Sequence, residues 1–272
     1  MASTPSSTSS SSVPVLMDSN FSPESQRLWE LAQQLRLYKP PPSTDDEDEI
    51  EENTGKVVSQ VGFSQSATSI TQSERFRPKR AAVLVCLFED DVGDLRVILT
   101  RRSKRLSTHS GQVALPGGKA EAGDANDTDT ALREAKEEIG LDPSLVNVVT
   151  VLEPFLTRDF LRVIPVIGIL SNRQSFKPTP NAGEVELVFD APLEMFIKDE
   201  NRTAEQRERM GHKYLIHFFD YETENKKFII WGLTARILIH AASVVYQRPP
   251  PFLEQNPNFK FIWSVTPNAT LP

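Results

Sequence analysis

The chain has 272 residues, a formal net charge of −7 and one cysteine, Cys86. This length fits one domain or a modest two, because domains contain roughly 100–200 residues. A single cysteine excludes an intramolecular disulfide framework and any C-x-x-C zinc or redox motif. No apolar run reaches the roughly 18 residues that predict a membrane span. We therefore expect an intracellular globular protein.

The negative charge is concentrated in the first 74 residues, which hold 11 acidic and 4 basic residues. The remaining residues, 75–272, hold 26 of each and are neutral overall. A protein that binds nucleic acid nonspecifically carries an excess of basic residues. We therefore expect neither a nucleic acid nor a membrane as a partner.

Residues 1–75 predict an extension ahead of the folded domain. Residues 1–17 carry no charge and are mostly Ser, Thr, Pro and Ala. This composition is typical of a disordered tail, although an organelle-targeting segment also fits it. Residues 22–38 predict a short amphipathic helix, with Ser22 as its cap and Pro23 in its first turn. We expect this helix to pack on the main body or on a second copy of the chain, and an acidic linker to follow it.

The folded domain is predicted over residues 76–248, and a Pro-rich tail over 249–272. Apolar and alternating stretches predict its strands over residues 81–88, 95–100, 146–152, 162–170, 184–188, 214–221 and 227–231. Helices are expected from Pro192 and over residues 233–246. Strands and helices mix without regular alternation, which favours an α+β domain or an α/β/α sandwich over a doubly wound sheet.

A further helix is predicted to end at Gly140, because a glycine is typical of a helix C-terminus. Asp127 or Asp129 can cap its start. Leu132, Ala135 and Ile139 are expected to form its buried stripe.

Three glutamates of this helix, Glu134, Glu137 and Glu138, stand at positions i, i+3 and i+4 on one side. Like charges at this spacing weaken an isolated helix. A hard divalent cation reverses that effect, because Mg²⁺ and Mn²⁺ prefer carboxylate oxygens. A solvated acidic face is the alternative interpretation. Upstream, Gly117 and Gly118 allow the backbone to approach the helix or a phosphate closely.

These residues resemble the signature of the Nudix hydrolases. That signature is a Gly, five residues, a Glu, seven residues and then R-E-U-x-E-E-x-G-U, where U is aliphatic. Residues 133–141 (REAKEEIGL) match the second half, with Ala as a small U. The first half departs from the signature, because Asp124 replaces the Glu six residues after Gly118 and the following spacer is one residue longer. The resemblance implies a Nudix-type α/β/α sandwich with a mixed sheet.

A second motif is similar to that of the coenzyme A-cleaving Nudix subfamily, L-L-T-x-R-[SA]-x3-R-x3-G-x3-F-P-G-G. Residues 98–118 (ILTRRSKRLSTHSGQVALPGG) keep its spacing. Ser107 replaces an Arg of the motif and Leu115 replaces its Phe. The whole resemblance covers about residues 76–246 and is especially to eukaryotic mitochondrial coenzyme A diphosphatases.

The resemblance implies a set of site residues. The catalytic residues would be Arg133, Glu134, Glu137 and Glu138, with the three glutamates as ligands of Mg²⁺ or Mn²⁺. Arg133 would orient them through an ion pair with the neighbouring loop. Contacts to substrate phosphates would come from Arg101, Arg102, Gly117, Gly118 and Lys119, within a basic cluster that also holds Lys104 and Arg105. The general base stays open between a glutamate of the motif, Glu184 and Glu186, and His109 is a candidate for a phosphate contact or a capping role.

The resemblance further implies hydrolysis of coenzyme A or acyl-coenzyme A to 3′,5′-ADP and 4′-phosphopantetheine or its acyl form. A Nudix diphosphatase for ADP-ribose, NADH or another nucleotide diphosphate derivative is the alternative within the enzyme class. A non-catalytic Nudix binding module is the second alternative, and the neutral body disfavours an RNA cap hydrolase. The mitochondrion or the cytosol is the expected compartment, with the plastid as an alternative, and a homodimer stays open.

Overall fold

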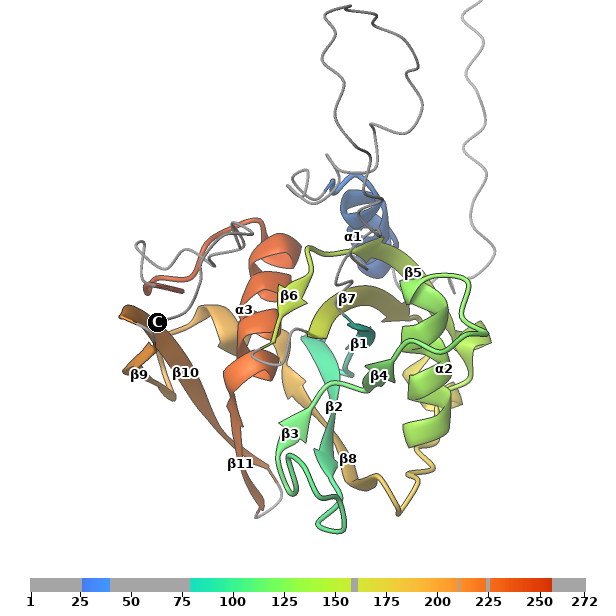
Figure 1. Cartoon of the computed structure of the whole chain (residues 1–272). Coiled ribbons are helices and arrows are strands. Elements are labelled where there is room, and N and C mark those ends of the chain that lie inside the picture. Colours follow the sequence, from blue (N-terminus) through green and yellow to red (C-terminus); the bar gives the residue numbers. More distant parts are fainter. Residues whose placement is uncertain (1–25, 40–78, 158–160, 210, 224–225, 256–272) are drawn as a thin grey trace, which may run out of the picture.

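The computed structural model describes residues 26–39, 79–157, 161–209, 211–223 and 226–255. Within these residues, a large mixed sheet is flanked by helices and by a second, smaller sheet (Figure 1). None of the helices described is long and apolar enough to cross a membrane. The expectations for the Ser-rich start, the caps Ser22 and Pro23, the acidic linker and the end of the Pro-rich tail lie outside the described residues.

The large sheet contains the first eight strands of the described chain. They are β1 (Lys79–Glu89), β2 (Leu95–Arg102), β3 (Val113–Ala114), β4 (Gly117–Lys119), β5 (Val146–Val151), β6 (Phe155–Leu156), β7 (Leu161–Leu170) and β8 (Val185–Pro192). β1 pairs in parallel with β7 and antiparallel with β2 and β4. The remaining strands extend this centre, since β3 and β8 pair with β2 while β5 and β6 pair with β7.

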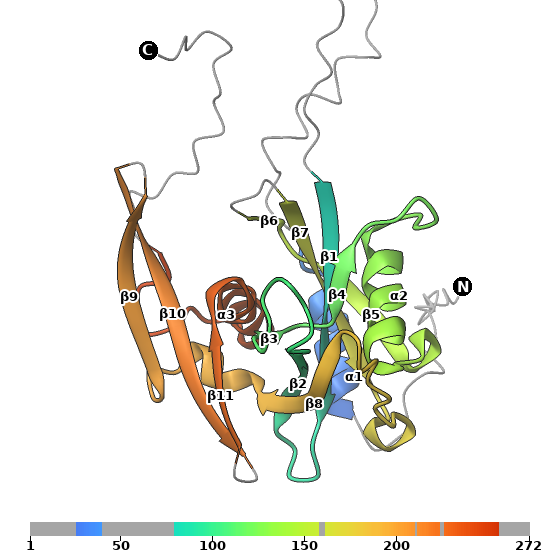
Figure 2. The same cartoon turned by 60° about the horizontal axis from the view of Figure 1, so that its bottom comes forward.

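The other elements follow or flank that sheet. The small sheet contains β9 (Arg202–Arg209), β10 (His212–Thr223) and β11 (Lys226–Trp231), and the helices are α1 (Gln26–Arg36), α2 (Asp127–Ile139), α3 (Gly232–Tyr246) and the 3-10 helices η2 (Pro143–Leu145), η3 (Arg173–Ser175) and η4 (Leu193–Ile197). Figure 2 places α2 on one side of the large sheet and α3 with the small sheet on the other. The architecture is the expected α+β sandwich around a mixed sheet.

The core is divided by the large sheet, because successive side chains of a strand point to opposite faces. Even-numbered residues of β1, such as Leu84 and Cys86, pack against Ala135 and Ile139 of α2. Cys86 is fully buried there, so its thiol packs in the core. Odd-numbered residues such as Val85 belong to a larger cluster with α1, α3 and the small sheet.

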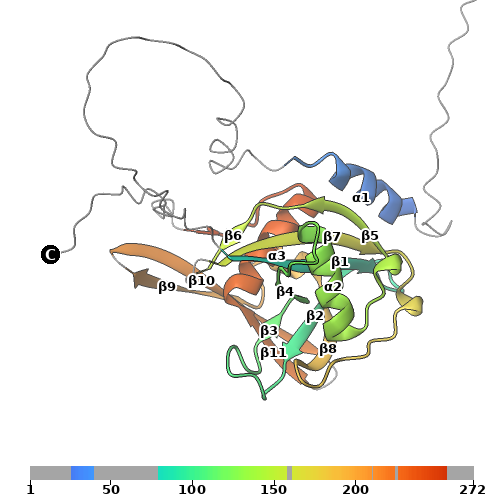
Figure 3. The same cartoon turned by 45° about the vertical axis from the view of Figure 1, so that its right-hand side comes forward.

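Helix α1 packs on the main body, which is one of the two arrangements that the sequence predicted. Its buried residues Leu28, Ala32 and Leu35 have the predicted helical spacing and join the larger cluster. The Gln34 side-chain amide donates a hydrogen bond to the Val245 carbonyl at the end of α3, 3.1 Å away. Figure 3 shows α1 lying along the outside of the molecule beside β5.

Several elements differ from the sequence-based expectation, which did not include the short strands β3, β4 and β6 or the 3-10 helices η2 and η3. The segment after Pro192 forms a 3-10 helix of five residues, η4, and not an α-helix. Strand β9 was not predicted, because its sequence RTAEQRER lacks any apolar alternation. It forms through main-chain pairing with β10, from Arg202 opposite Phe219 onward. The expected β10–β11 hairpin is confirmed.

Candidate active site

Helix α2 carries the candidate site, and both of its ends are fixed by hydrogen bonds. Asn126 caps the start, because its extended backbone (φ −158°) lets its side chain accept from the Asp129 N–H. The expectation of Asp127 or Asp129 as the cap was therefore wrong by one or three residues. Gly140 ends the helix with φ 71°, the left-handed conformation that favours glycine. Ala135 and Ile139 are fully buried, whereas Leu132 of the predicted stripe is only partly buried.

The two glycines of β4 let this strand lie directly against β1 and α2. A Cβ on Gly117 would stand 2.4 Å from the Ala82 carbonyl oxygen, and φ at this position is +152°. A Cβ on Gly118 would stand 2.4 Å from the carboxyl carbon of Glu134. Gly117 therefore requires glycine, because backbone fills the space beside it, whereas a side chain on Gly118 would displace the Glu134 carboxylate.

Glu138 is the most deeply buried of the three glutamates, with a side chain 3% exposed. Its Oε2 accepts a hydrogen bond of 3.1 Å from the Gly117 N–H, and its Oε1 lies 3.8 Å from Nη1 of Arg102. Burial raises the pKa of Glu138 to about 7, although the Gly117 N–H and Arg102 oppose that shift. The carboxyl group is thus held in place while its negative charge is incompletely compensated.

Glu134 and Glu137 occupy different environments on the same helix. The Glu134 side chain is 14% exposed, and burial raises its pKa. The Glu137 side chain is 57% exposed. Arg133 donates to both of them through Nη1, 3.1 Å from Glu134 and 3.2 Å from Glu137. The predicted carboxylate face exists, but its three members differ in access to solvent.

Arg133 forms the predicted ion pair between α2 and the neighbouring loop, and its partner is Asp124. Nε and Nη2 of Arg133 donate to the two Asp124 carboxylate oxygens over 2.9 and 3.0 Å. Nη2 also donates to the Lys119 carbonyl at 3.0 Å. The Thr130 hydroxyl and the Glu121 N–H donate to the same carboxylate. Hydrogen bonding from Arg133 holds the pKa of Asp124 well below its ordinary value.

Sequence reasoning left the role of Asp124 in doubt, because Asp124 departs from the family motif in both residue type and spacing. The longer spacer permits the contact, since Asp124 and Arg133 are nine residues apart and yet form a bidentate pair. The sequence did contain a signal for this role of Asp124. It is an acidic residue near the expected glutamate position, and the helix that follows carries an arginine on its first turns.

The loop over residues 179–184 docks against the C-terminal end of α2. The Thr179 and Asn181 N–H groups donate to the Ile139 and Glu138 carbonyls, which lack partners within α2. This docking brings Glu184 close enough to raise the pKa values of Glu134 and Glu138 by charge repulsion, a smaller effect than burial. Glu184, one of the candidates for the general base, therefore lies within electrostatic range of Glu134 and Glu138 and joins the acidic cluster.

The predicted basic cluster divides between the two faces of the large sheet. Arg102 faces Glu138, whereas Arg101 donates to Glu186 of β8 at 2.9 Å and lies 5.8 Å from the Phe228 ring centroid. The Nε atoms of Arg101 and Arg102 are both buried without a hydrogen-bond partner among the described residues. Lys119, Lys104 and Arg105 are exposed.

The positions flanking the glycines have structural partners. His109 has a positive φ of 54°, and its Nδ1 lies 3.0 Å from the Gln112 Oε1, which favours the capping role over the phosphate contact. Glu121 is 68% exposed and lies 3.9 Å from Arg133.

The residues present fit a hard divalent cation by the chemistry of their donor atoms. Glu134, Glu138 and Glu184 supply carboxylate oxygens whose mutual repulsion a bound cation would relieve. Across the described residues, no three acidic, histidine or cysteine side chains converge at the spacing that a metal ion requires. Arg133, which bridges Glu134 and Glu137, occupies part of the space between the carboxylates.

The model of the NUDIX domain matches residues 78–186, which include β1, α2 and the loop that carries Glu184. The chain belongs to the Nudix hydrolase family, which acts on phosphorus anhydrides of nucleotide derivatives and generally uses divalent metal ions. It is 60% identical over 257 residues to "Nudix hydrolase 22, chloroplastic" of Arabidopsis thaliana, covering 93% of this chain and 83% of that protein.

Two further relatives extend the comparison. "Nudix hydrolase 15, mitochondrial" of Arabidopsis thaliana is 68% identical over 212 residues, covering 78% of this chain and 74% of that protein. "Peroxisomal coenzyme A diphosphatase NUDT7" of Mus musculus is 36% identical over 162 residues, covering 59% of this chain and 68% of that protein. The two plant names state compartments, plastid and mitochondrion, that the sequence analysis had kept among its options.

Proposed function

We propose that the chain is a metal-dependent diphosphatase that hydrolyses coenzyme A or acyl-coenzyme A to 3′,5′-ADP and 4′-phosphopantetheine or its acyl form. The observation that carries the proposal is the buried carboxylate pair, Glu134 and Glu138, docked on the Gly117–Gly118 backbone next to Arg102. The motif over residues 98–118 and the similarity to the mouse coenzyme A diphosphatase support the substrate.

Glu134, Glu137 and Glu138 would hold Mg²⁺ or Mn²⁺, which when bound neutralises phosphate charge and lowers the pKa of a water molecule. The Gly117 N–H holds Glu138 in position. Arg133 orients Glu134 and Glu137, and Asp124 fixes Arg133 to the loop. Each side chain is thereby placed before substrate arrives, and preorganised charge supplies most of the rate in phosphoryl transfer.

Glu184 is the preferred general base among the candidates. It belongs to the acidic cluster, whereas Glu186 is engaged by Arg101 at 2.9 Å on the opposite face of the sheet. Arg102, with its buried and unpartnered Nε, would contact the diphosphate. Because the Gly117 N–H already bonds Glu138, its contribution is to position that carboxylate and not to bind phosphate. Gly118 and the exposed Lys119 would border the bound diphosphate.

A substrate panel tests the proposal directly. Purified protein is incubated with coenzyme A, succinyl-coenzyme A, ADP-ribose and NADH, each with Mg²⁺, with Mn²⁺ and with a chelator, and products are separated by chromatography. Metal-dependent release of 3′,5′-ADP at a higher kcat/KM than AMP release from the other substrates is expected. Preferred cleavage of ADP-ribose or NADH would select the alternative substrate. If neither metal ion enhances the hydrolysis of any of these substrates, the result would favour a non-catalytic binding module. The compartment, for which the plant relatives suggest an organelle, is tested by expressing a fluorescent fusion.

A further inference from the structure

The loop over residues 178–184 joins the end of α2 to the end of β2, and it carries Glu184. Its sequence is Pro-Thr-Pro-Asn-Ala-Gly-Glu. Pro178 and Pro180 restrict its course, because a proline ring fixes φ and removes the N–H donor. The residue before a proline is also confined to extended conformations. The sequence of this loop therefore favours a single, stiff path for the chain.

The first half of the loop is fixed to α2 through the N–H groups that lie between and after the two prolines. The Thr179 N–H donates to the Ile139 carbonyl over 2.9 Å. The Asn181 N–H donates to the Glu138 carbonyl, also over 2.9 Å. Gly140 permits this approach, because a Cβ at its position would stand 3.0 Å from the Thr179 Cβ. The main chain at Asn181 is thus tied to the residue whose carboxylate belongs to the acidic cluster.

Asn181 also shapes the turn that leads to Glu184. Its Oδ1 accepts from the Gly183 N–H at 3.1 Å, the hydrogen bond by which an asparagine typically forms a turn. Its carbonyl accepts from the N–H groups of Glu184 and Val185, at 2.9 and 2.8 Å. Its Nδ2 donates to the Glu184 Oε1 at 3.4 Å. One asparagine therefore contacts both the main chain and the carboxylate of Glu184.

The far end of the loop is tied to Ser103, the residue that follows β2. The Ser103 N–H donates to the Glu184 carbonyl at 2.7 Å. The Ser103 hydroxyl donates to the Ala182 carbonyl at 3.3 Å. Ser103 is only 5% exposed, so water has little access to it. The turn that carries Glu184 is therefore held at both of its ends.

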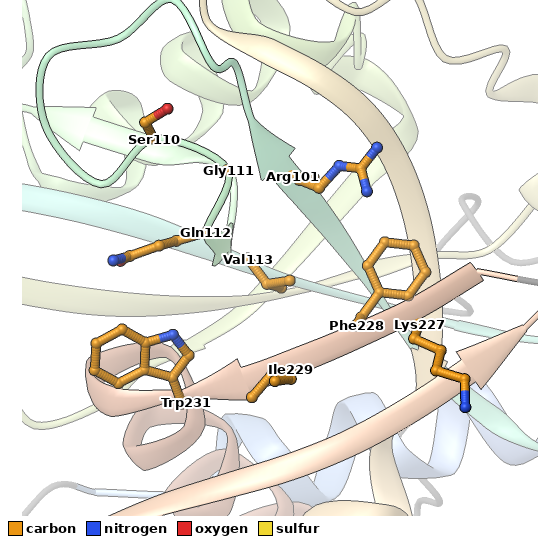
Figure 4. A pocket seen from close by; sticks show the side chains of 9 residues that line it. All are labelled: Arg101, Ser110, Gly111, Gln112, Val113, Lys227, Phe228, Ile229 and Trp231. Carbon is orange, nitrogen blue, oxygen red and sulfur yellow. The ribbon is translucent and has the colours of Figure 1, made fainter.

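Of the two arginines at the end of β2, only Arg102 belongs to this junction. Arg102 lies 3.8 Å from Glu138 and directly precedes Ser103. Arg101 lies beside the Phe228 ring and lines a pocket of about 270 Å³ next to β11 (Figure 4). The hydrogen bonds of the loop thus relate Glu184 to one acidic and one basic residue of the candidate site.

We propose that Asn181 is the positioning residue for Glu184. Its main chain fixes the loop to α2, and its side chain directs the Glu184 carboxylate. The inference rests on the proposed function, in which Glu184 takes the proton of the attacking water. A general base must lie within hydrogen-bond reach of the proton that it removes. Asn181 therefore acts on the reaction through Glu184.

A double-mutant cycle tests the proposal, on the substrate that the native chain cleaves best. Asn181→Ala should lower kcat about tenfold and leave KM within about twofold, since a group that orients a site residue typically contributes 10- to 100-fold. In the Glu184→Gln background, the same substitution should change kcat less than about twofold, because the carboxylate that Asn181 directs is already gone. Equal losses of kcat in the two backgrounds would overturn the proposal. Asn181 is exposed, so these variants should fold.

A second variant separates the contact with Glu184 from the shape of the turn. Asn181→Asp keeps an oxygen for the Gly183 N–H but replaces the amide donor with a negative charge beside Glu184. It should lower kcat at least as much as Asn181→Ala, and native activity would overturn the proposal. Asn172→Ala is the matched control and should keep the native kcat, because Asn172 is exposed and its Oδ1 accepts from the Ser175 N–H of η3.

Failure of this inference can be distinguished from failure of the proposed function. Full activity of Glu184→Gln on coenzyme A would overturn the role of Asn181 and keep the function. Preferred cleavage of ADP-ribose or NADH would reject the proposed substrate, and the same cycle would still decide the role of Asn181.

Hydrogen exchange provides a test without turnover, should the chain cleave none of these substrates. The amides of Glu184 and Val185 should exchange about tenfold faster in Asn181→Ala than in the native chain, the usual effect of losing one hydrogen bond. Unchanged exchange of both amides would overturn the positioning role.

Discussion

On the two faces of the large sheet, the residues that contact one another differ in how far apart they are in the sequence. On the α2 face, the contacts that organise the acidic cluster are short in sequence, nine residues for Arg133 with Asp124 and 21 for Gly117 with Glu138. On the opposite face, Tyr38 reaches Glu153 across 115 residues and Gln34 reaches Val245 across 211. The comparison shows that residues 102–138, together with the loop over residues 179–184, assemble the candidate chemistry, while residues from the whole described chain assemble its support.

The two faces should therefore respond differently to substitution. Changes on the α2 face should lower turnover more than stability. Changes on the opposite face should lower stability more than turnover.

Glu138→Gln tests the α2 face and has the largest expected effect. The amide keeps the shape of the carboxyl group but removes its charge, so kcat for the preferred substrate should fall about 1,000-fold. Circular dichroism should show that the variant remains folded, because burying a neutral amide at this position costs less desolvation than burying a carboxylate. Glu121→Gln, at a position 68% exposed, is the matched control. Retained activity in Glu138→Gln would contradict the metal assignment.

Leu35→Ala tests the opposite face. Leu35 is 1% exposed in the cluster that joins α1 to α3, so its truncation should lower the free energy of unfolding by about 3 kcal/mol. The kcat/KM of the folded variant should stay within twofold of the native value at 20 °C. Leu37→Ala, at a position 80% exposed, should change neither quantity. A large loss of kcat/KM in Leu35→Ala, measured well below its melting temperature, would show that the two faces are coupled.

Asp124→Asn sharpens the contrast within the α2 face, because it alters a positioning residue that touches no substrate. The variant weakens the bidentate pair with Arg133, and kcat/KM should fall about 10- to 100-fold, as is typical when a residue behind a metal ligand is lost. Asp127→Asn is the control, since Asp127 pairs with the half-exposed Arg80 at the same end of α2. An unchanged metal dependence of the rate in Asp124→Asn would limit Arg133 to a structural role.

Tyr38→Phe has the smallest expected effect and tests the polar contact between α1 and the far face. The Tyr38 hydroxyl donates to Glu153 Oε1 at 2.6 Å, and His240 lies 2.6 Å from the other carboxylate oxygen. Losing the first bond should lower the free energy of unfolding by about 1–2 kcal/mol. Tyr246→Phe is the control, because the Tyr246 hydroxyl has no hydrogen bond among the described residues.

The same contact predicts a pH dependence. Burial alone would raise the pKa of Glu153, but the hydrogen bonds from Tyr38 and His240 outweigh burial and hold that pKa below the ordinary 4.5. A lowered folded-state pKa adds stability that is fully present above pH 4.5 and is lost as the pH falls below it. Denaturant unfolding of the native chain and Tyr38→Phe should therefore differ most above pH 4.5 and converge in acid. A difference that grows in acid would contradict this account.

The sequence by itself determined the acidic face of α2 and most of the longer strands and helices of the architecture. The spacing of Glu134, Glu137 and Glu138, the glycine at each end of the motif and the apolar strands are local patterns, and local patterns are legible because periods of 2 and 3.6 residues follow from backbone geometry. The predicted face of α1 was correct for the same reason. The strand β9 escaped prediction because its residues show no apolar alternation and it forms by main-chain pairing with β10, which leaves no trace in side-chain type.

Only the tertiary structure decided how the charged residues are distributed. Arg101 and Arg102 are adjacent in sequence, yet they face opposite sides of the sheet, since a strand alternates its side chains and one member meets β11 while the other meets Glu138. Asp124 and Glu184 joined the cluster through loops whose course no periodic pattern specifies. A loop is positioned by what it docks against, here the open carbonyls at the end of α2, and that partner exists only once the chain has folded.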